Sequence, residues 1–218
     1  MVVRNQERFA EDCLRLAKPY MSRHRTERHR LVPEDSALLV IDMQGLFLEH
    51  HSHSFIPDAE RILGNVQGLL GAYRARKLPI VFTRHALGPS EDAGAMGRWW
   101  ADVTRDGDKA GEIDPRLGVR KGEKVFRKTR YSAFVGTGLD RHLKSKSVSS
   151  LVITGVMTHL CCESTARDAF MRDYDVFLVV DGTASKTRDL HLSSIKTLTD
   201  GFAIPVKTSE VVRCLRTK

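Results

Sequence analysis

The sequence predicts a three-layer α/β fold, in which a Rossmann-like, mainly parallel sheet of six strands carries helices on both faces. Two observations support this prediction. Six short apolar runs lie between residues 37 and 206, and helical patterns separate most of them. Strands that alternate with helices are typical of a parallel sheet covered on both sides. The first run, ALLVID at 37–42, is almost continuously apolar, which indicates a buried parallel strand.

The elements follow one another in a regular order after an N-terminal helix. Residues 5–21 have apolar side chains near helical spacing, and a basic segment then leads to Pro33. We therefore expect a helix and basic linker over residues 1–32 and one domain over residues 33–218. The expected strands are 37–42, 79–84, 123–128, 150–155, 175–181 and 201–206, and the expected helices are 58–76, 137–146, 161–173 and 189–199. The stretch 85–122 shows no regular pattern, and an irregular segment of this length is usually functional or part of an interface.

The composition is that of a globular protein, because 41% of the residues are hydrophobic and 28% are charged. No apolar run approaches the ~20 residues of a membrane span, and the N-terminal region lacks an apolar signal core. The cysteines are too few and too irregularly spaced for a disulfide framework. They are Cys13, Cys161, Cys162 and Cys214. We therefore expect a cytoplasmic protein that does not bind membranes.

The net charge of +8 raises the question of a nucleic-acid partner. Much of this charge is local, because residues 22–30 (SRHRTERHR) hold four arginines against one glutamate. No aromatic residues alternate with these arginines. We therefore expect a solvated basic linker and no nucleic-acid partner.

Three polar residues stand where expected strands end, namely Asp42, Lys128 and Cys161. Each has an ordinary explanation alone, as a turn former, a solvated lysine or a small buried hydrophobe. Together they should meet, because the carboxyl ends of parallel strands share one edge of a sheet. A thiolate can attack a carbonyl group, and a nearby ammonium group and a helix N-terminus favour that anion. A carboxylate can take the thiol proton and return it to a leaving amine. The set therefore predicts a nucleophilic amidohydrolase site.

Three segments carry a family resemblance: LLVIDMQ (38–44), RKTRYSAFVGT (127–137) and GVMTHLCCESTARDA (155–169). They resemble, in order, the signature segments of the isochorismatase-like cysteine hydrolases. That superfamily includes nicotinamidases, N-carbamoylsarcosine and ureidoacrylate amidohydrolases, and isochorismatases. The resemblance extends from about residue 36 to 206. It implies that Asp42, Lys128 and Cys161 are catalytic, with Cys161 as the nucleophile, and that Cys162 is buried and inert.

The resemblance also implies a cis peptide bond between Val156 and Met157. This bond would aim the backbone N–H of Met157, together with that of Cys161, at a developing oxyanion.

Relatives are commonly oligomers, so a homo-oligomer, either a dimer or a tetramer, is expected. The substrate should be a small molecule. The candidate pocket residues are Gln44, His85, Arg98, Trp99, Tyr131 and His159. Arg84, Arg98 and Arg130 could each bind a substrate carboxylate, although surface charge is the ordinary explanation for each.

The chain departs from its relatives at two places. Nicotinamidases carry an Asp-x-His metal motif after the second strand, whereas here His85 and Leu87 stand at those positions. We therefore expect neither a metal nor another cofactor. The cluster His50, His51 and His53 is expected to form an exposed loop, with a metal site as the alternative. His159 stands where asparagine is common, either as a pocket residue or as a substitution at the start of a helix.

The sequence leaves several functions open. The first is a cofactor-free hydrolase of a small amide, carbamoyl or ureido compound, working through a covalent thioester-type intermediate. Isochorismatase-type cleavage of a vinyl ether is an alternative, although enzymes of that type usually lack the cysteine. A non-catalytic, oligomeric binding protein would not need all three catalytic residues. A thiol redox protein using Cys161 and Cys162 lacks the CxxC spacing of common redox motifs.

Overall fold

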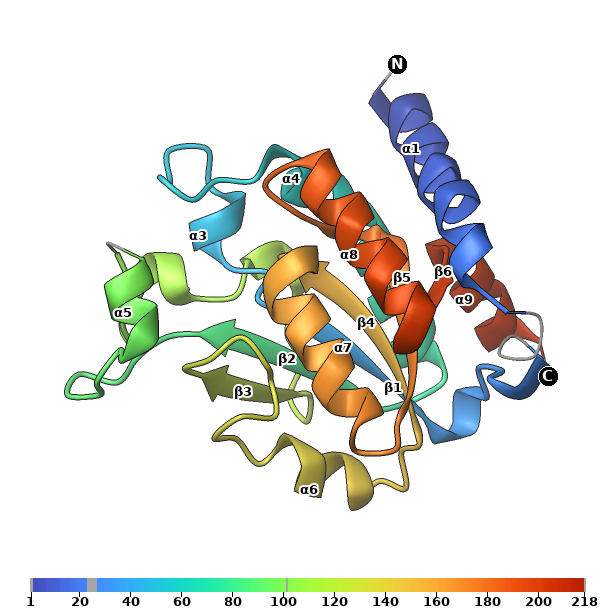
Figure 1. Ribbon diagram of the computed structural model, residues 1–218. Coiled ribbons are helices and arrows are strands. Elements are labelled where there is room, and N and C mark those ends of the chain that lie inside the picture. Colours follow the sequence, from blue (N-terminus) through green and yellow to red (C-terminus); the bar gives the residue numbers. More distant parts are fainter. Residues whose placement is uncertain (1, 23–26, 101, 218) are drawn as a thin grey trace.

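The computed structural model describes residues 2–22, 27–100 and 102–217, and it shows a sheet between two layers of helices (Figure 1). The sheet has six strands in the order β3-β2-β1-β4-β5-β6, and every neighbouring pair is parallel. The predicted α/β fold is thus confirmed, and the described sheet is parallel throughout. The strands are β1 (Ser36–Ile41), β2 (Ile80–His85), β3 (Lys124–Lys128), β4 (Ser150–Val156), β5 (Asp175–Ala184) and β6 (Ile204–Val206).

Helices cover both faces of this sheet because its strands carry apolar side chains on both sides. In β1, Leu39 and Ile41 belong to one core cluster, whereas Leu38 and Val40 belong to the other. Figure 1 shows α7 and α8 in front of the sheet and α4 behind it. The helices that contribute to the first cluster are α1 (Val2–Ala17), α6 (Leu139–Lys144), α7 (Glu163–Phe170) and α8 (Arg188–Gly201). Those that contribute to the second are α3 (Gly45–Leu48), α4 (Pro57–Ala75) and α9 (Thr208–Arg216).

The N-terminal helix packs on the domain that follows it. Ala10, Cys13 and Ala17 of α1 are buried in the first core cluster, and α1 contacts α8 and β5. A 3-10 turn, Lys18–Tyr20, extends this helix. Of the predicted basic linker, residues 23–26 lie outside the described residues. Within the part of the chain that the structure describes, no helix combines the length and the apolar character needed to cross a membrane.

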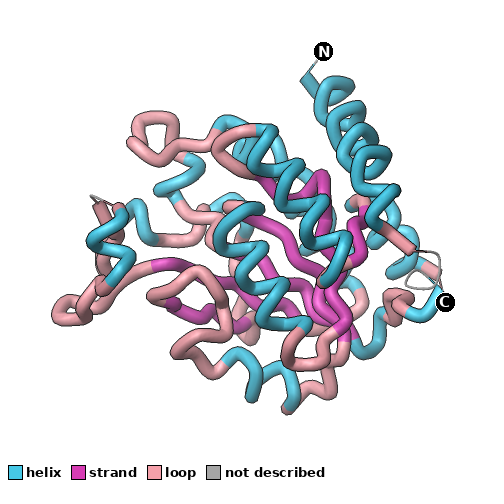
Figure 2. The backbone as a smooth tube through the Cα atoms, in the orientation of Figure 1, coloured by secondary structure: helices cyan, strands magenta, loops and turns pink. Residues whose placement is uncertain are grey.

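The stretch 85–122 was predicted to be irregular, but it contains a short helix, α5 (Ala95–Trp99), and two 3-10 turns. The turns are Lys109–Gly111 and Pro115–Leu117. Figure 2 shows that loops nevertheless dominate this part of the chain. The C-terminal helix α9 was also missed. The helix α5 and the 3-10 turns are too short for apolar periodicity to reveal them. In α9, the buried residues Val211 and Leu215 do have helical spacing, so its pattern was present in the sequence.

The strand order places a crevice between β1 and β4. The chain runs outward from β1 through β2 to β3 and then returns to the other side of β1 as β4. Ligands of parallel sheets bind outside the carboxyl ends of the strands at such a reversal.

Gly155 lets β4 approach β1 closely at this point. Its φ angle is +111°, and a Cβ atom here would lie only 2.0 Å from the carbonyl oxygen of Ile41. Only glycine fits such a position. The residues that follow β1 and β4 are therefore held side by side.

Candidate active site

The three residues predicted to be catalytic lie together at the carboxyl edge of the sheet. Asp42 directly follows β1, Lys128 ends β3, and Cys161 lies in a π-helical turn, Thr158–Cys162, between β4 and α7. The Nζ atom of Lys128 lies 2.7 Å from Oδ2 of Asp42 and 3.3 Å from Sγ of Cys161. It also donates to the carbonyl oxygen of Arg130 at 3.0 Å. The ammonium group thus makes two hydrogen bonds, to the sulfur and to the carbonyl oxygen, and an ion pair with the carboxylate.

The ion pair between Asp42 and Lys128 is fully buried, since both side chains are 0% exposed. Burial opposes the charge of Lys128, but the Asp42 carboxylate and then Cys161 raise the pKa of Lys128 above its ordinary value. Lys128 is therefore protonated at neutral pH. A buried ion pair of this kind is strongly coupled, and removing one partner leaves an uncompensated charge in the interior.

The thiol of Cys161 keeps its proton in the resting site. Burial raises its pKa to about 12, Asp42 acts in the same direction, and the charge of Lys128 opposes both. Lys128 favours the anion, as expected of a nearby ammonium group, but burial is the larger effect. The proton must therefore leave the sulfur as the sulfur attacks.

Asp42 is placed to take that proton. Its Oδ1 atom accepts a hydrogen bond from the hydroxyl group of Thr83 at 2.7 Å. Its Oδ2 atom faces the Lys128 ammonium group, but it has no aligned hydrogen-bond donor among the described residues. Hydrogen bonding to Asp42 is one of the causes that raise the pKa of the Cys161 thiol. One carboxylate oxygen is thus anchored by Thr83, while the other lies against Lys128 without an aligned donor among the described residues and can accept a proton.

Cys161 lines a cavity of about 100 Å³, which has room for a small molecule. Two of the predicted pocket residues, His85 and Tyr131, line this cavity with it. Its walls come from α3, α5, Trp100, the segments 53–54 and 102–104, and the turn that follows β4. They consist largely of Leu46, Phe47, His53, Met96, Trp100, Asp102, Val103, Thr104, Met157 and Leu160.

Four predicted pocket residues do not line this cavity. Gln44 is buried behind it. Its Oε1 atom accepts a hydrogen bond from the His85 N–H at 2.8 Å, and its Nε2 atom donates to the His85 carbonyl oxygen at 3.1 Å. His159 lies beside Ser185, and its Nδ1 atom is 3.0 Å from the Ser185 hydroxyl oxygen. Arg98 and Trp99 are exposed on α5. Gln44 therefore shapes the site from behind, and the other three point elsewhere.

Trp100 takes the place expected of Trp99. Its Nε1 atom donates to the Tyr131 hydroxyl oxygen at 2.8 Å, and both residues line the cavity. The side chain of Trp99 is 79% exposed. The two tryptophans are adjacent in the sequence, but Trp99 ends α5 whereas Trp100 follows it with extended backbone, so their side chains leave the chain in different directions.

Sequence reasoning also missed Thr83, Val103 and Thr104. Thr83 holds Asp42 through two contacts, since its hydroxyl group also lies 3.2 Å from the Asp42 backbone nitrogen. A threonine near a strand end is common, and its role depends on β2 lying beside β1. That pairing could not be read from residue spacing.

The peptide bond between Val156 and Met157 is cis in the structure. Met157 and Cys161 both line the cavity. Their backbone N–H groups remain the predicted donors to an oxyanion.

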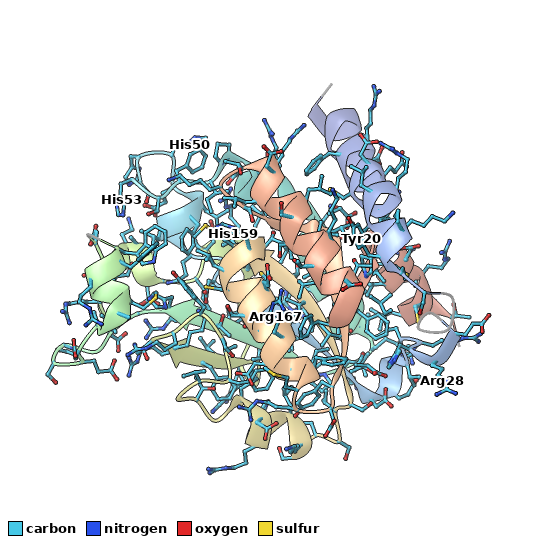
Figure 3. The ribbon with its side chains drawn as sticks, viewed as in Figure 1. Tyr20, Arg28, His50, His53, His159 and Arg167 are labelled. Carbon is cyan, nitrogen blue, oxygen red and sulfur yellow. The ribbon has the colours of Figure 1, made fainter. Side chains whose placement is uncertain are left out.

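The described histidines are spread over several separate contacts. Within the described residues, no group of three or more histidine, cysteine, aspartate or glutamate side chains could hold a metal ion. His50 and His53 lie in the loop after α3 (Figure 3). His51 pairs with Glu49 at 3.0 Å, and His53 pairs with Asp102 at 3.5 Å. Leu87, at the place of a family metal ligand, is a buried apolar side chain.

Activity is expected to survive dialysis against EDTA, because the ligand positions of a nicotinamidase-type metal site hold His85 and Leu87. The measurement is the rate of ammonia release before and after dialysis, with added Zn²⁺ or Mn²⁺ as the control. A loss that either metal restores would contradict this expectation and direct attention to His53.

Stability is expected to fall as the pH drops from 7 to 5, because two histidines are buried in their neutral form. Burial is the main cause that lowers the pKa of both His85 and His191 to about 4. An unfolded histidine titrates near 6.5, so below that pH the unfolded chain binds more protons. This effect amounts to roughly 2 kcal/mol per histidine at pH 5.

The measurement is urea unfolding at pH 7 and pH 5 for the native chain, for His191→Gln and for the exposed control His51→Gln. The pH-dependent loss should shrink by about half in His191→Gln and stay unchanged in His51→Gln. Equal losses in all three proteins would mean that His191 titrates normally in the folded chain.

Comparison with known proteins places this site in context. The family model of the isochorismatase domain matches residues 36–210. Nicotinamidase 3 of Arabidopsis thaliana is 37% identical over 183 residues, which cover 83% of this chain and 88% of that protein. Enterobactin synthase component B of Escherichia coli strain K12 is 33% identical over 182 residues, which cover 83% of this chain but only 63% of that protein. The solved structure of a cysteine hydrolase from Pseudomonas syringae pv. phaseolicola 1448A superimposes with a TM-score of 0.82 at 26% identity, covering 85% of this chain and 94% of that one.

Proposed function

The chain belongs to the isochorismatase family of hydrolases, and from this premise we propose that it hydrolyses a small amide, carbamoyl or ureido compound through a covalent thioester-type intermediate. One observation carries the proposal. The Lys128 ammonium group bridges the Asp42 carboxylate and the Cys161 sulfur at the wall of a cavity. A binding protein without catalysis has no need of a buried ion pair beside a thiol, because such pairs rarely add stability.

In the first half of the reaction, Asp42 Oδ2 takes the thiol proton while Sγ forms a bond to the substrate carbonyl carbon. The carbonyl oxygen becomes an oxyanion, which the N–H groups of Met157 and Cys161 would stabilise. The Lys128 charge favours the sulfur anion while it forms. The C–N bond then breaks, the leaving amine takes the proton from Asp42, and the acyl group stays on Cys161 as a thioester.

In the second half, water attacks the thioester carbonyl carbon while Asp42 takes a proton from that water. The bond between the carbon and Sγ breaks, and the proton returns to the sulfur. The product is an acid, and the site regains its resting protonation state. No electron donor or acceptor is needed, and each proton that moves passes through Asp42.

The test measures ammonia release from a panel of amides, carbamoyl compounds and ureido acids. Intact mass spectrometry after acid quenching should show a Cys161-linked acyl adduct with any accepted substrate. A vinyl-ether hydrolase would release no ammonia and form no adduct. A redox protein would instead link Cys161 to Cys162, both of which are free thiols in the structure.

A further inference from the structure

The cavity beside Cys161 presents no cationic side chain to a substrate. The titratable residues that line it are His53, His85, Asp102, Tyr131 and Cys161 itself, and the described residues of its wall include no lysine or arginine. Lys128 lies behind Cys161 with a side chain that is 0% exposed, and its charge is matched by that of Asp42. Most of the remaining wall is apolar or aromatic, as in Phe47, Met96, Trp100 and Val103.

The arginines that could recognise a substrate carboxylate do not line the cavity. Arg84 pairs with Asp106 at 2.5 Å. Arg130 turns back on the chain, where its Nη1 atom donates to the Thr129 carbonyl oxygen at 2.8 Å. Arg98 is exposed on α5. None of the three lines the cavity, so none supplies the bidentate contact that carboxylate recognition ordinarily uses.

His85 does not replace this missing charge. Burial, together with the charges of Lys128 and Arg130, lowers its pKa to about 4, with Asp42 opposing the shift. The imidazole is therefore neutral at pH 7 and can act only as a neutral hydrogen-bonding group. The other histidine of the wall, His53, already pairs with the Asp102 carboxylate.

A substrate carboxylate would meet an unfavourable environment in this cavity. It would lose hydration water against an apolar wall, and burying an unpaired carboxylate costs several kcal/mol. The charged groups nearby would not compensate this cost, because Lys128 already pairs with Asp42 and His53 with Asp102. An uncharged amide with an apolar acyl group meets none of these penalties, and its group can pack against Phe47 and Trp100.

We propose that the substrate is an electrically neutral amide with an apolar acyl group, and that amides and ureido compounds bearing a carboxylate are rejected. This inference rests on the proposed hydrolase function and narrows it.

The first experiment compares two amides that differ by one carboxylate, benzamide and 4-carbamoylbenzoate. The ratio of their kcat/KM values, from ammonia release at pH 7.5, should favour benzamide by at least about 100-fold, the equivalent of ~2.7 kcal/mol. Met96→Arg places a guanidinium group at the cavity wall and should narrow this ratio at least about tenfold. The control Met96→Gln should keep it.

The second experiment measures ligand binding at Cys161 without hydrolysis. Benzaldehyde and 4-carboxybenzaldehyde can add reversibly to Cys161: Sγ bonds to the carbonyl carbon, and the thiol proton ends on the oxygen. Each aldehyde should slow the alkylation of Cys161 by iodoacetamide, which is measured by peptide mapping. The protecting concentration of each aldehyde is corrected for its intrinsic affinity for a free thiol in solution. Benzaldehyde should protect at concentrations at least about 100-fold lower.

The outcomes separate this inference from the function on which it rests. Preferred hydrolysis of 4-carbamoylbenzoate, equal protection by both aldehydes, or protection by neither would overturn the neutral substrate class. A preference for the carboxylate that disappears in Arg130→Met would assign its recognition to Arg130. Selective protection by benzaldehyde without any amide turnover would support the preference of the cavity for neutral ligands and would contradict the proposed hydrolase function.

Discussion

Replacement of Cys161 by alanine is expected to lower kcat/KM by on the order of 10⁴-fold or more, which leaves only background hydrolysis. The sulfur forms the bond to the substrate, and no neighbouring group can substitute for it. The fold should persist, because alanine is small and Cys161 forms no disulfide. The measurement is ammonia release with the best substrate of the panel, together with the thermal unfolding midpoint of each variant.

Cys162→Ala is the matched control, because it makes the same chemical change one residue along the chain. Cys162 is 0% exposed within a core cluster, and burial is the main cause that raises its pKa well above the ordinary value. This variant should retain most of its activity and lose modest stability from the small cavity it creates. An inactive Cys162→Ala beside an active Cys161→Ala would shift the nucleophile by one position.

Asp42→Asn is expected to lower kcat by about 10³-fold, because the amide keeps the shape of the side chain but cannot accept the thiol proton. The hydroxyl group of Thr83 can still donate to the remaining oxygen, so the side chain should stay in place. Raising the pH should not restore turnover, since the leaving amine still needs the proton that Asp42 would have carried. Rates measured from pH 6 to pH 10 test this directly.

Lys128→Met supplies the contrast, because it removes charge rather than a proton acceptor. Lys128 opposes the high pKa of Cys161, so its loss should slow iodoacetamide alkylation at neutral pH, with partial recovery in alkali. Stability should also fall, because Asp42 would be left buried without a counter-charge. If stability falls while the pH profile of alkylation stays unchanged, Lys128 only holds the strand ends together and is not catalytic.

The sequence was sufficient to predict the sheet and the meeting of Asp42, Lys128 and Cys161. Each of these residues follows or ends an apolar run, and parallel strands deliver such positions to one edge. It was not sufficient for contacts that depend on strand neighbours, such as the one between Thr83 and Asp42. The choice between Trp99 and Trp100 depended on where the short helix α5 ends. The protonation of Cys161 depended on burial, which no residue spacing encodes.

The position of α5 has an optical consequence. The chain has two tryptophans, and both stand at this helix beside the cavity, one exposed and one hydrogen-bonded to Tyr131. Intrinsic tryptophan emission therefore reports on this end of the molecule and not on the distant helices α1 and α9. A Trp99→Phe variant would leave Trp100 as a single emitter at the cavity wall. Ligand occupancy could then be followed by quenching of its fluorescence, without a label and on the stopped-flow timescale.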